Sequence, residues 1–169
     1  MLEVKGSKTF HAEWLHNNSL RKTNKFVSIN LKSLSGTLIE SELFGHEKNA
    51  FNNADERKGL LEEANNGTLF LDEIHNTPIS DQLKLLTIFN KKEIVIRRVG
   101  GNKDIPINVR IIWGTNKDLS KEVMNGNFHY EFKNRIDSRS DTIFISSLNE
   151  RRNEISTRRH DNSPFRDNT

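Results

Sequence analysis

The chain has 169 residues, of which 33% are hydrophobic and 29% charged, with a formal net charge of +3 and a pI near 9.2. The absence of cysteine excludes disulfides, thiolate nucleophiles and cysteine-type zinc sites. No apolar run approaches the roughly 18 residues of a membrane span. Because acidic and basic residues are interspersed, the mild basicity does not indicate a nucleic-acid binder. We expect a cytoplasmic, soluble domain with a thin core.

Apolar periodicity predicts helices that alternate with strands. Phe10, Trp14 and Leu15 have helical spacing, and residues 68–71 form an apolar run without alternation, which is typical of a parallel strand covered on both faces. The other predicted elements are a strand at 26–30, helices at 38–43, 59–64 and 81–89, a hairpin of 93–99 with 105–109, a strand at 110–113, a helix at 119–124 and a strand at 142–145. We expect one domain over residues 1–155 and a polar, disordered tail over 156–169.

This alternation predicts an α/β fold built on a parallel sheet. In such sheets, ligands bind beyond the carboxyl ends of the strands. Polar residues follow three of the predicted strands, namely Asn30, Asp72-Glu73 and Thr115-Asn116. The sequence therefore predicts that these polar groups converge at one edge of the sheet.

Asp72 and Glu73 resemble a Walker B element, because they follow an apolar strand directly. A rigid strand end can deliver one carboxylate to Mg²⁺ and the next to an attacking water. The alternative is a strand that meets a polar helix start, with Asp72 as the N-cap.

Lys8 and Thr9 are the candidate phosphate-binding pair. A P-loop needs glycines before the lysine, so that backbone N–H groups can surround the phosphates. The G-x-x-x-x-G-K template requires glycine at positions 2 and 7, but the chain has Leu2 and Ser7, and its only nearby glycine is Gly6. The pattern is incomplete, and the alternative is an ordinary helix start.

An ordered series of motifs resembles the AAA+ domain of bacterial enhancer-binding proteins, the ATPases that activate sigma-54 RNA polymerase. The resemblance covers about residues 8–155 and rests on the segments 42–48, 49–54, 67–74, 98–101, 109–119 and 148–155. It implies the α/β subdomain of a P-loop NTPase, with ATP and Mg²⁺ as ligands, sigma-54 RNA polymerase as partner and a homo-oligomeric ring.

The resemblance also implies roles for individual residues. Catalytic roles fall to Glu73, which activates water, to Asn30, which restrains that glutamate, to the sensor residue Asn116 and to the arginine finger Arg135. Nucleotide contacts fall to Gly6, Ser7, Lys8, Thr9, Asp72 and Thr115, of which Thr9 and Asp72 also hold Mg²⁺. The second arginine position of the finger segment holds His129, which is a poor substitute for a permanently charged, bidentate guanidinium.

Residues 49–54 align with the GAFTGA loop, which touches the sigma factor in this family. Its expected contact residues are Ala50, Phe51 and Asn52. Asparagines at 49, 52 and 53 replace Gly, Thr and Gly, so the threonine hydroxyl is lost while left-handed backbone geometry stays accessible. The alternative for Phe51 is an apolar anchor folded back onto its own helix.

Relative to the family, the sequence lacks the strand before the P-loop, the helical lid and a DNA-binding domain, so we expect a chain truncated at both ends. The leading hypothesis is an ATP-binding AAA+ domain whose hydrolysis drives polymerase remodelling, impaired here by the incomplete P-loop. The alternative is a non-catalytic or degenerate module that binds sigma factor or activator oligomers without turnover. A nucleic-acid binder that uses the Arg-rich tail is the least favoured class.

Overall fold

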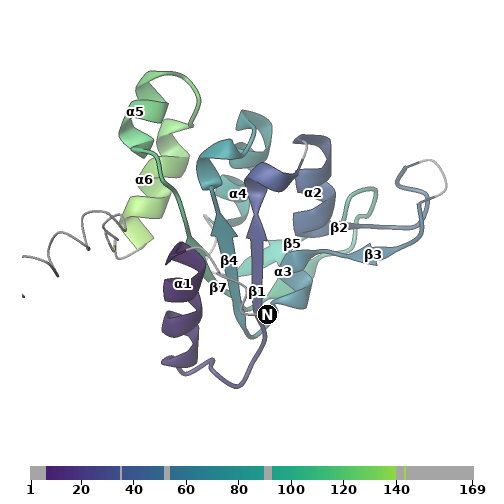
Figure 1. Cartoon of the computed structure of the whole chain (residues 1–169). Coiled ribbons are helices and arrows are strands. Elements are labelled where there is room, and N and C mark those ends of the chain that lie inside the picture. The colour runs from purple at the N-terminus through teal and green to yellow at the C-terminus, as the bar shows by residue number, and fades with distance from the viewer. Residues whose placement is uncertain (1–6, 35, 52–53, 90–92, 140–142, 144–169) are drawn as a thin grey trace, which may run out of the picture.

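The computed structural model describes residues 7–34, 36–51, 54–89, 93–139 and 143, and it shows a parallel sheet with helices around it (Figure 1). The helices are α1 (Ser7–Asn17), η1 (Leu31–Ser33), α2 (Gly36–Phe44), α3 (Leu60–Glu63), η2 (Ile74–Asn76), α4 (Ile79–Phe89), α5 (Leu119–Met124) and α6 (Tyr130–Arg139). The strands are β1 (Phe26–Asn30), β2 (Gly45–His46), β3 (Arg57–Lys58), β4 (Thr68–Asp72), β5 (Ile94–Ile96), β6 (Ile105–Ile107) and β7 (Arg110–Trp113). The sheet has the order β1-β4-β7, and all its strands are parallel. The predicted α/β fold is therefore confirmed.

Strand β4 is the centre of the sheet. Residues 68–71 are all buried, because β1 and β7 pair with its two edges and helices cover its two faces. Leu69 and Leu71 enter the main core cluster. Phe70 is buried on the opposite face, as the alternation of side chains along a strand requires, and α1 contacts β4 there. The apolar run without alternation thus predicted this strand correctly.

Several other predicted elements are confirmed at their predicted bounds: the strands at 26–30 and 110–113 and the helix at 119–124. The predicted hairpin is also present, although β5 and β6 are shorter than expected, with Ile94 opposite Ile107 in an antiparallel register. The predicted strand at 142–145 and the tail at 156–169 lie outside the described residues, apart from the exposed Ile143.

Helix α1 forms where the spacing of Phe10 and Trp14 predicted a helix, but these two side chains do not mark its buried face. Phe10 is 60% exposed and Trp14 57% exposed. The helix buries Ala12 and His16 instead, and His16 Nδ1 lies 3.0 Å from Thr68 Oγ1 at the start of β4. A buried polar pair therefore anchors α1 to the sheet.

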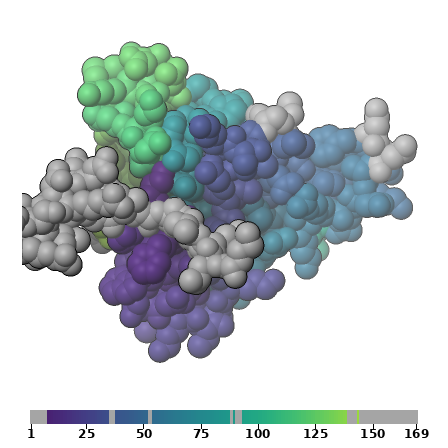
Figure 2. Space-filling view, viewed as in Figure 1, coloured from purple at the N-terminus to yellow at the C-terminus, as the bar shows by residue number. Residues whose placement is uncertain are grey.

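Two features of the fold were not predicted. The strands β2 and β3 have two residues each, and they form the base of a hairpin that projects from the side of the domain (Figure 2). Helix α6 packs against α4 and α5, and Phe128 and Phe132 stack with ring centroids 5.4 Å apart beside Trp113. No helix within the described ranges is long and apolar enough to cross a membrane.

Candidate functional site

A lysine bridges two carboxylates at the carboxyl end of β4. Lys8 Nζ, from the first turn of α1, lies 2.8 Å from Asp72 Oδ1 and also forms an ion pair with Glu73 Oε1. The exposed fractions of the three side chains are 26%, 14% and 13%. Burial lowers the pKa of Lys8, but the hydrogen bonds and charges of the two carboxylates outweigh it and raise this pKa above its ordinary value. The sequence-predicted phosphate lysine and the predicted carboxylates thus form one site.

The backbone turns sharply at Glu73. This residue has φ 57° and ψ 45°, a left-handed conformation that costs a non-glycine residue about 1–2 kcal/mol. Asp72 Oδ1 accepts a hydrogen bond of 2.9 Å from the Glu73 N–H, and Gly114 O accepts one of 2.9 Å from the Ile74 N–H. These two bonds hold the strained turn, which aims the Asp72 and Glu73 side chains at the same end of the sheet.

Gly114 makes room for the carboxylate. A Cβ at this position would lie 2.6 Å from Asp72 Oδ1 and 2.9 Å from the ring of Phe70. Gly114 follows β7 directly, so its lack of a side chain allows the end of β7 to approach the end of β4.

Polar groups from β7 and η2 complete the site. Thr115 Oγ1 lies 3.1 Å from His75 Nδ1, and the same nitrogen lies 3.4 Å from Glu73 Oε2. Asn116 is exposed beside them. Thr9 follows Lys8 on α1 and is half-buried. His75 was not among the predicted site residues. Its position beside Glu73 depends on the left-handed turn at Glu73, which no sequence pattern predicts.

Asn30 reaches the predicted edge of the sheet, where its register partner is Asp72. Its side chain accepts a hydrogen bond of 2.9 Å from the Lys32 N–H and thereby caps η1. The structure therefore places Asn30 on the strand next to the site but directs its amide oxygen to the following turn. Gly6 lies outside the described residues, and only the backbone of Ser7 is described.

Arg135 lies on α6. Its Nε and Nη2 atoms donate hydrogen bonds of 3.0 and 2.9 Å to Phe89 O, the last carbonyl of α4. A cation at this position satisfies a helix C-terminus. The neighbouring His129 N–H donates to Gln82 Oε1 at 2.7 Å. The predicted arginine-finger role remains a prediction, and the guanidinium has a structural partner within its own chain.

The predicted contact loop begins after β2 and returns to β3. Asn49 has φ 63°, and its N–H donates to Ala54 O at 2.8 Å, which closes the loop. Asn49, which aligns with a glycine in the expected loop motif, thus adopts left-handed geometry, as asparagine does more readily than most residues. Phe51 is 46% exposed, and its ring meets that of His46 edge to face at 5.4 Å. Ala50 lies against Gly100, while Asn52 is outside the described residues.

A cluster of ion pairs, absent from the sequence prediction, holds the base of this loop. Arg98 donates hydrogen bonds of 2.7 and 2.9 Å to the carboxylate of Glu62 on α3. It also pairs with Glu56 and lies 3.5 Å from Glu47, on the two arms of the loop. The Arg98 hydrogen bonds lower the pKa of Glu62 below its ordinary value of 4.5, although burial acts in the opposite direction.

Replacing Arg98 by methionine is expected to destabilise the domain by about 2–3 kcal/mol at pH 7, because the carboxylate of Glu62, which is 10% exposed, loses its hydrogen-bonded cation. Since the folded-state pKa of Glu62 is lowered, the pair contributes above pH 4.5 and its contribution is lost as the pH falls through the folded pKa. The difference in unfolding free energy between wild type and variant should therefore shrink in acid. Urea unfolding at pH 7 and at several pH values below 4.5 measures it.

The matched control is Arg97→Met. Arg97 carries the same side chain one position earlier, but its pair with Asp104 is exposed on both sides, at 62% and 61%. We expect no measurable loss of stability from this variant. Equal losses from Arg97→Met and Arg98→Met would contradict the role assigned to the Arg98 cluster.

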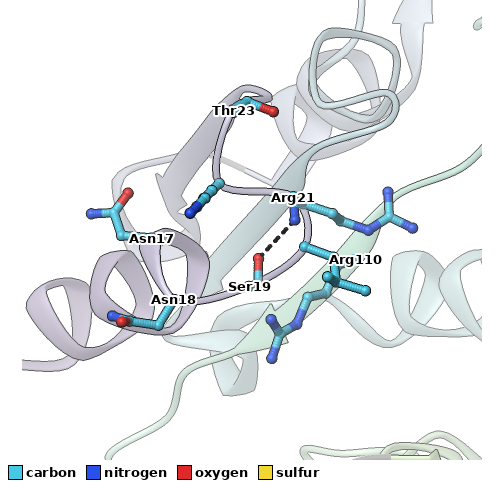
Figure 3. A pocket seen from close by; sticks show the side chains of 8 residues that line it. Asn17, Asn18, Ser19, Arg21, Thr23 and Arg110 are labelled. Carbon is cyan, nitrogen blue, oxygen red and sulfur yellow. Dashed lines mark hydrogen bonds between the residues drawn. The ribbon is translucent and has the colours of Figure 1, made fainter.

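An open hollow of about 810 Å³ lies at the opposite end of the sheet (Figure 3). It is lined by residues 17–23 and Arg110. The guanidinium of Arg21 binds Asn66 O at 2.9 Å and Asn108 Oδ1 at 2.7 Å. Arg21 therefore joins the turns that precede β1, β4 and β7. Its charge in this hollow thus serves to hold the turns together, and we assign the hollow no ligand.

The fold and the bridged carboxylates at the end of β4 define an AAA+ domain. The family profile named Sigma-54 interaction domain matches residues 4–140. The chain therefore belongs to this family, the AAA+ domains of bacterial enhancer-binding proteins. This confirms the resemblance read from the motif series.

Similar proteins agree with this assignment. The chain is 47% identical over 145 residues to the Nif-specific regulatory protein of Herbaspirillum seropedicae, and this alignment covers 85% of this chain and 26% of that protein. It is 42% identical to the regulatory protein AtoC of Escherichia coli, over 86% of this chain and 31% of that protein. The solved structure of NtrX from Brucella abortus in complex with ATP matches with a TM-score of 0.76 and 31% identity, over 89% of this chain and 33% of that chain. The chain thus spans about a quarter to a third of these relatives.

Proposed function

We propose that this chain binds and hydrolyses ATP with Mg²⁺ as the AAA+ domain of a cytoplasmic, sigma-54-dependent transcription regulator. The observation that carries the proposal is the position of Lys8, which lies against both Asp72 and Glu73 at the carboxyl end of β4. A cation at this position can exchange its carboxylate partners for phosphate oxygens. The similar NtrX chain, solved in complex with ATP, supports the choice of nucleotide.

The available donors fit a magnesium ion that arrives with a nucleotide. No cluster of three or more metal-binding His, Cys, Asp or Glu side chains occurs among the described residues. Mg²⁺ in nucleotide sites needs only one or two protein oxygen ligands, because phosphates and water supply the others. Asp72 and Thr9 would supply these oxygens. When bound, Mg²⁺ with ATP supplies the reacting phosphate and neutralises its charge.

The chain's own residues would then act in sequence. Lys8 leaves the carboxylates for the phosphates, which frees Glu73 Oε1. Glu73 orients the attacking water and accepts its proton, since a carboxylate beside a strand end can serve as a general base. Thr115 and Asn116 lie at the end of the adjacent strand, where they can contact the terminal phosphate. Asn30, on the neighbouring strand β1, is the register partner of Asp72.

Coupling to polymerase would pass through the projecting hairpin. Phe51 lies in the loop between β2 and β3 and presents a half-exposed ring beside His46, and the Arg98 cluster holds the two arms of this loop. We propose that this loop, with Ala50 and Asn52, contacts the sigma factor in a homo-oligomeric ring. Arg135 would complete a neighbour's site, which requires it to exchange the Phe89 carbonyl for phosphate.

A non-catalytic module is the second candidate. The observation that favours it is the same ion-pair triad, because Lys8 already has strong partners and a nucleotide must compete with them. With asparagines in the contact loop and only Gly6 before the lysine, this chain would bind sigma factor or activator oligomers without turnover. Impaired hydrolysis is the intermediate possibility.

Phosphate release from Mg²⁺-ATP, measured over a range of protein concentrations, tests the proposal. We expect a specific activity that rises with protein concentration, because Arg135 would act on a neighbouring subunit. Binding of a fluorescent ATP analogue without phosphate release would support the non-catalytic module. If the chain neither binds the ATP analogue nor releases phosphate, the ATPase proposal is overturned.

A further inference from the structure

We propose that His75 is a positioning residue, which holds the carboxylate of Glu73 and the hydroxyl of Thr115 in a fixed relation at the end of the sheet. This inference rests on the proposed function, because it assigns Glu73 the role of base. It goes beyond that function by adding a residue from η2 that the motif series does not include. The side chain of His75 is 11% exposed, and it contacts Glu73, which follows β4, and Thr115, which follows β7.

The two oxygens of Glu73 have different surroundings. Oε1 is paired with Lys8. Oε2 is buried and accepts no aligned hydrogen bond from the described residues, and His75 Nδ1 lies 3.4 Å away from it. A buried carboxylate oxygen without a donor is costly, so a nearby N–H is the group that it requires. His75 can supply that N–H with a small movement of the Glu73 side chain.

The contacts of the other ring nitrogen fix the position of the proton. His75 Nε2 lies 3.3 Å from Asn76 Nδ2, which also donates to Glu73 O at 3.2 Å. Because the amide nitrogen can only donate, Nε2 is the acceptor and the neutral ring carries its proton on Nδ1. Nδ1–H then donates to Thr115 Oγ1 at 3.1 Å, while Glu73 Oε2 lies 3.4 Å from the same nitrogen without an aligned hydrogen bond. The hydroxyl of Thr115 and the carboxylate of the proposed base thus both lie beside one N–H donor.

Burial keeps this ring neutral near pH 7. Burial is the largest influence, and it lowers the pKa of His75 below its ordinary value of 6.5. The carboxylates of Glu73 and Glu122 raise this pKa, whereas the ammonium groups of Lys117 and Lys8 lower it. A neutral Nδ1–H donor can orient a carboxylate without neutralising it, which preserves its basicity.

This arrangement matters when Lys8 leaves Glu73. The carboxylate then loses its partner at Oε1, while the amide oxygen of Asn30 accepts a hydrogen bond from the Lys32 N–H. His75 remains as the donor beside Oε2. It would keep the carboxylate in place while Oε1 faces the attacking water.

Kinetics of two His75 variants test the proposal. His75→Ala is expected to lower the kcat of ATP hydrolysis by about 10–100-fold with little change in KM, because indirect positioning contacts have effects of this size. His75→Asn is expected to recover most of the kcat, because its amide can place an N–H near the position of Nδ1. Equal losses in both variants, or a kcat of His75→Ala within about twofold of wild type, would overturn the proposal. Thermal unfolding of both variants separates misfolding from a lost contact.

Nitrogen NMR of the imidazole provides a readout that needs no turnover. The wild-type ring is expected to be protonated on Nδ1 at pH 8, and Glu73→Gln is expected to lower the pKa of His75, because a charge that raises it is removed. Protonation on Nε2, or a pKa that does not respond to Glu73→Gln, would overturn the inference. If wild type shows no hydrolysis, the proposed function fails, and the NMR result still decides whether His75 orients Glu73.

Discussion

Replacing Glu73 by glutamine is expected to reduce steady-state ATP hydrolysis by about 100-fold or more, which is the usual contribution of a general base. Glutamine keeps the shape of the side chain but cannot accept a proton from water. The left-handed turn at Glu73 depends on backbone bonds to Asp72 Oδ1 and from Ile74 to Gly114 O, and this substitution leaves both intact. The loss should therefore lie in kcat.

Nucleotide affinity should be preserved or improved in this variant. Glu73 is one of two carboxylates that hold Lys8, so its neutralisation weakens the competition for the lysine. Titration with a fluorescent ATP analogue measures the affinity, and phosphate release measures turnover. Glu63→Gln is the matched control, since Glu63 is exposed on α3. Undiminished hydrolysis by Glu73→Gln would contradict the role of Glu73 as base.

The sequence predicted secondary structure best where the residues of a single segment indicate by themselves whether that segment is buried. Strand β4 was predicted because residues 68–71 are uniformly apolar, and a central parallel strand is buried on both faces. The convergence of Asp72, Glu73 and Thr115 followed from the rule that parallel strands end at a common edge. Helix α1 illustrates the limit of this reasoning. The spacing of its two aromatic residues predicted the helix correctly, but these residues do not lie on its buried face. His16 is buried there instead, because it contacts Thr68, which is 52 residues away in the chain.

Contacts between distant segments account for what was missed. The Arg98 cluster joins carboxylates that lie 36 to 51 residues away in the chain, and no local pattern reveals such pairs. Strands of two residues, such as β2 and β3, are too short to show an alternation. His75 meets Thr115 across 40 residues, at the turn where Glu73 takes its left-handed conformation. The sequence therefore predicted the sheet edge but not the support around it.

Replacing Lys8 by alanine is expected to weaken ATP binding by about 10–100-fold, because it removes a charged hydrogen-bond donor worth about 1.5–3 kcal/mol. It also leaves Asp72 and Glu73, two adjacent carboxylates with 14% and 13% exposed side chains, without their shared cation. We therefore expect the domain to lose about 1–3 kcal/mol of stability at pH 7. Denaturant unfolding and analogue titration measure the two effects. Lys84→Ala is the control, because the side chains of its pair with Glu40 are more exposed, at 46% and 35%.

The pH dependence of the loss identifies its origin. Because the folded-state pKa of Lys8 is raised, its contribution is fully present below the ordinary value of 10.5 and is lost as the pH rises through the folded pKa. Wild type and Lys8→Ala should therefore converge in stability in strongly alkaline solution. Adding Glu73→Gln to Lys8→Ala should restore part of the stability at pH 7, because it removes one of the two carboxylates that repel each other. It should not restore ATP binding. Recovery of both would mean that Lys8 neutralises the carboxylates and does not hold phosphate.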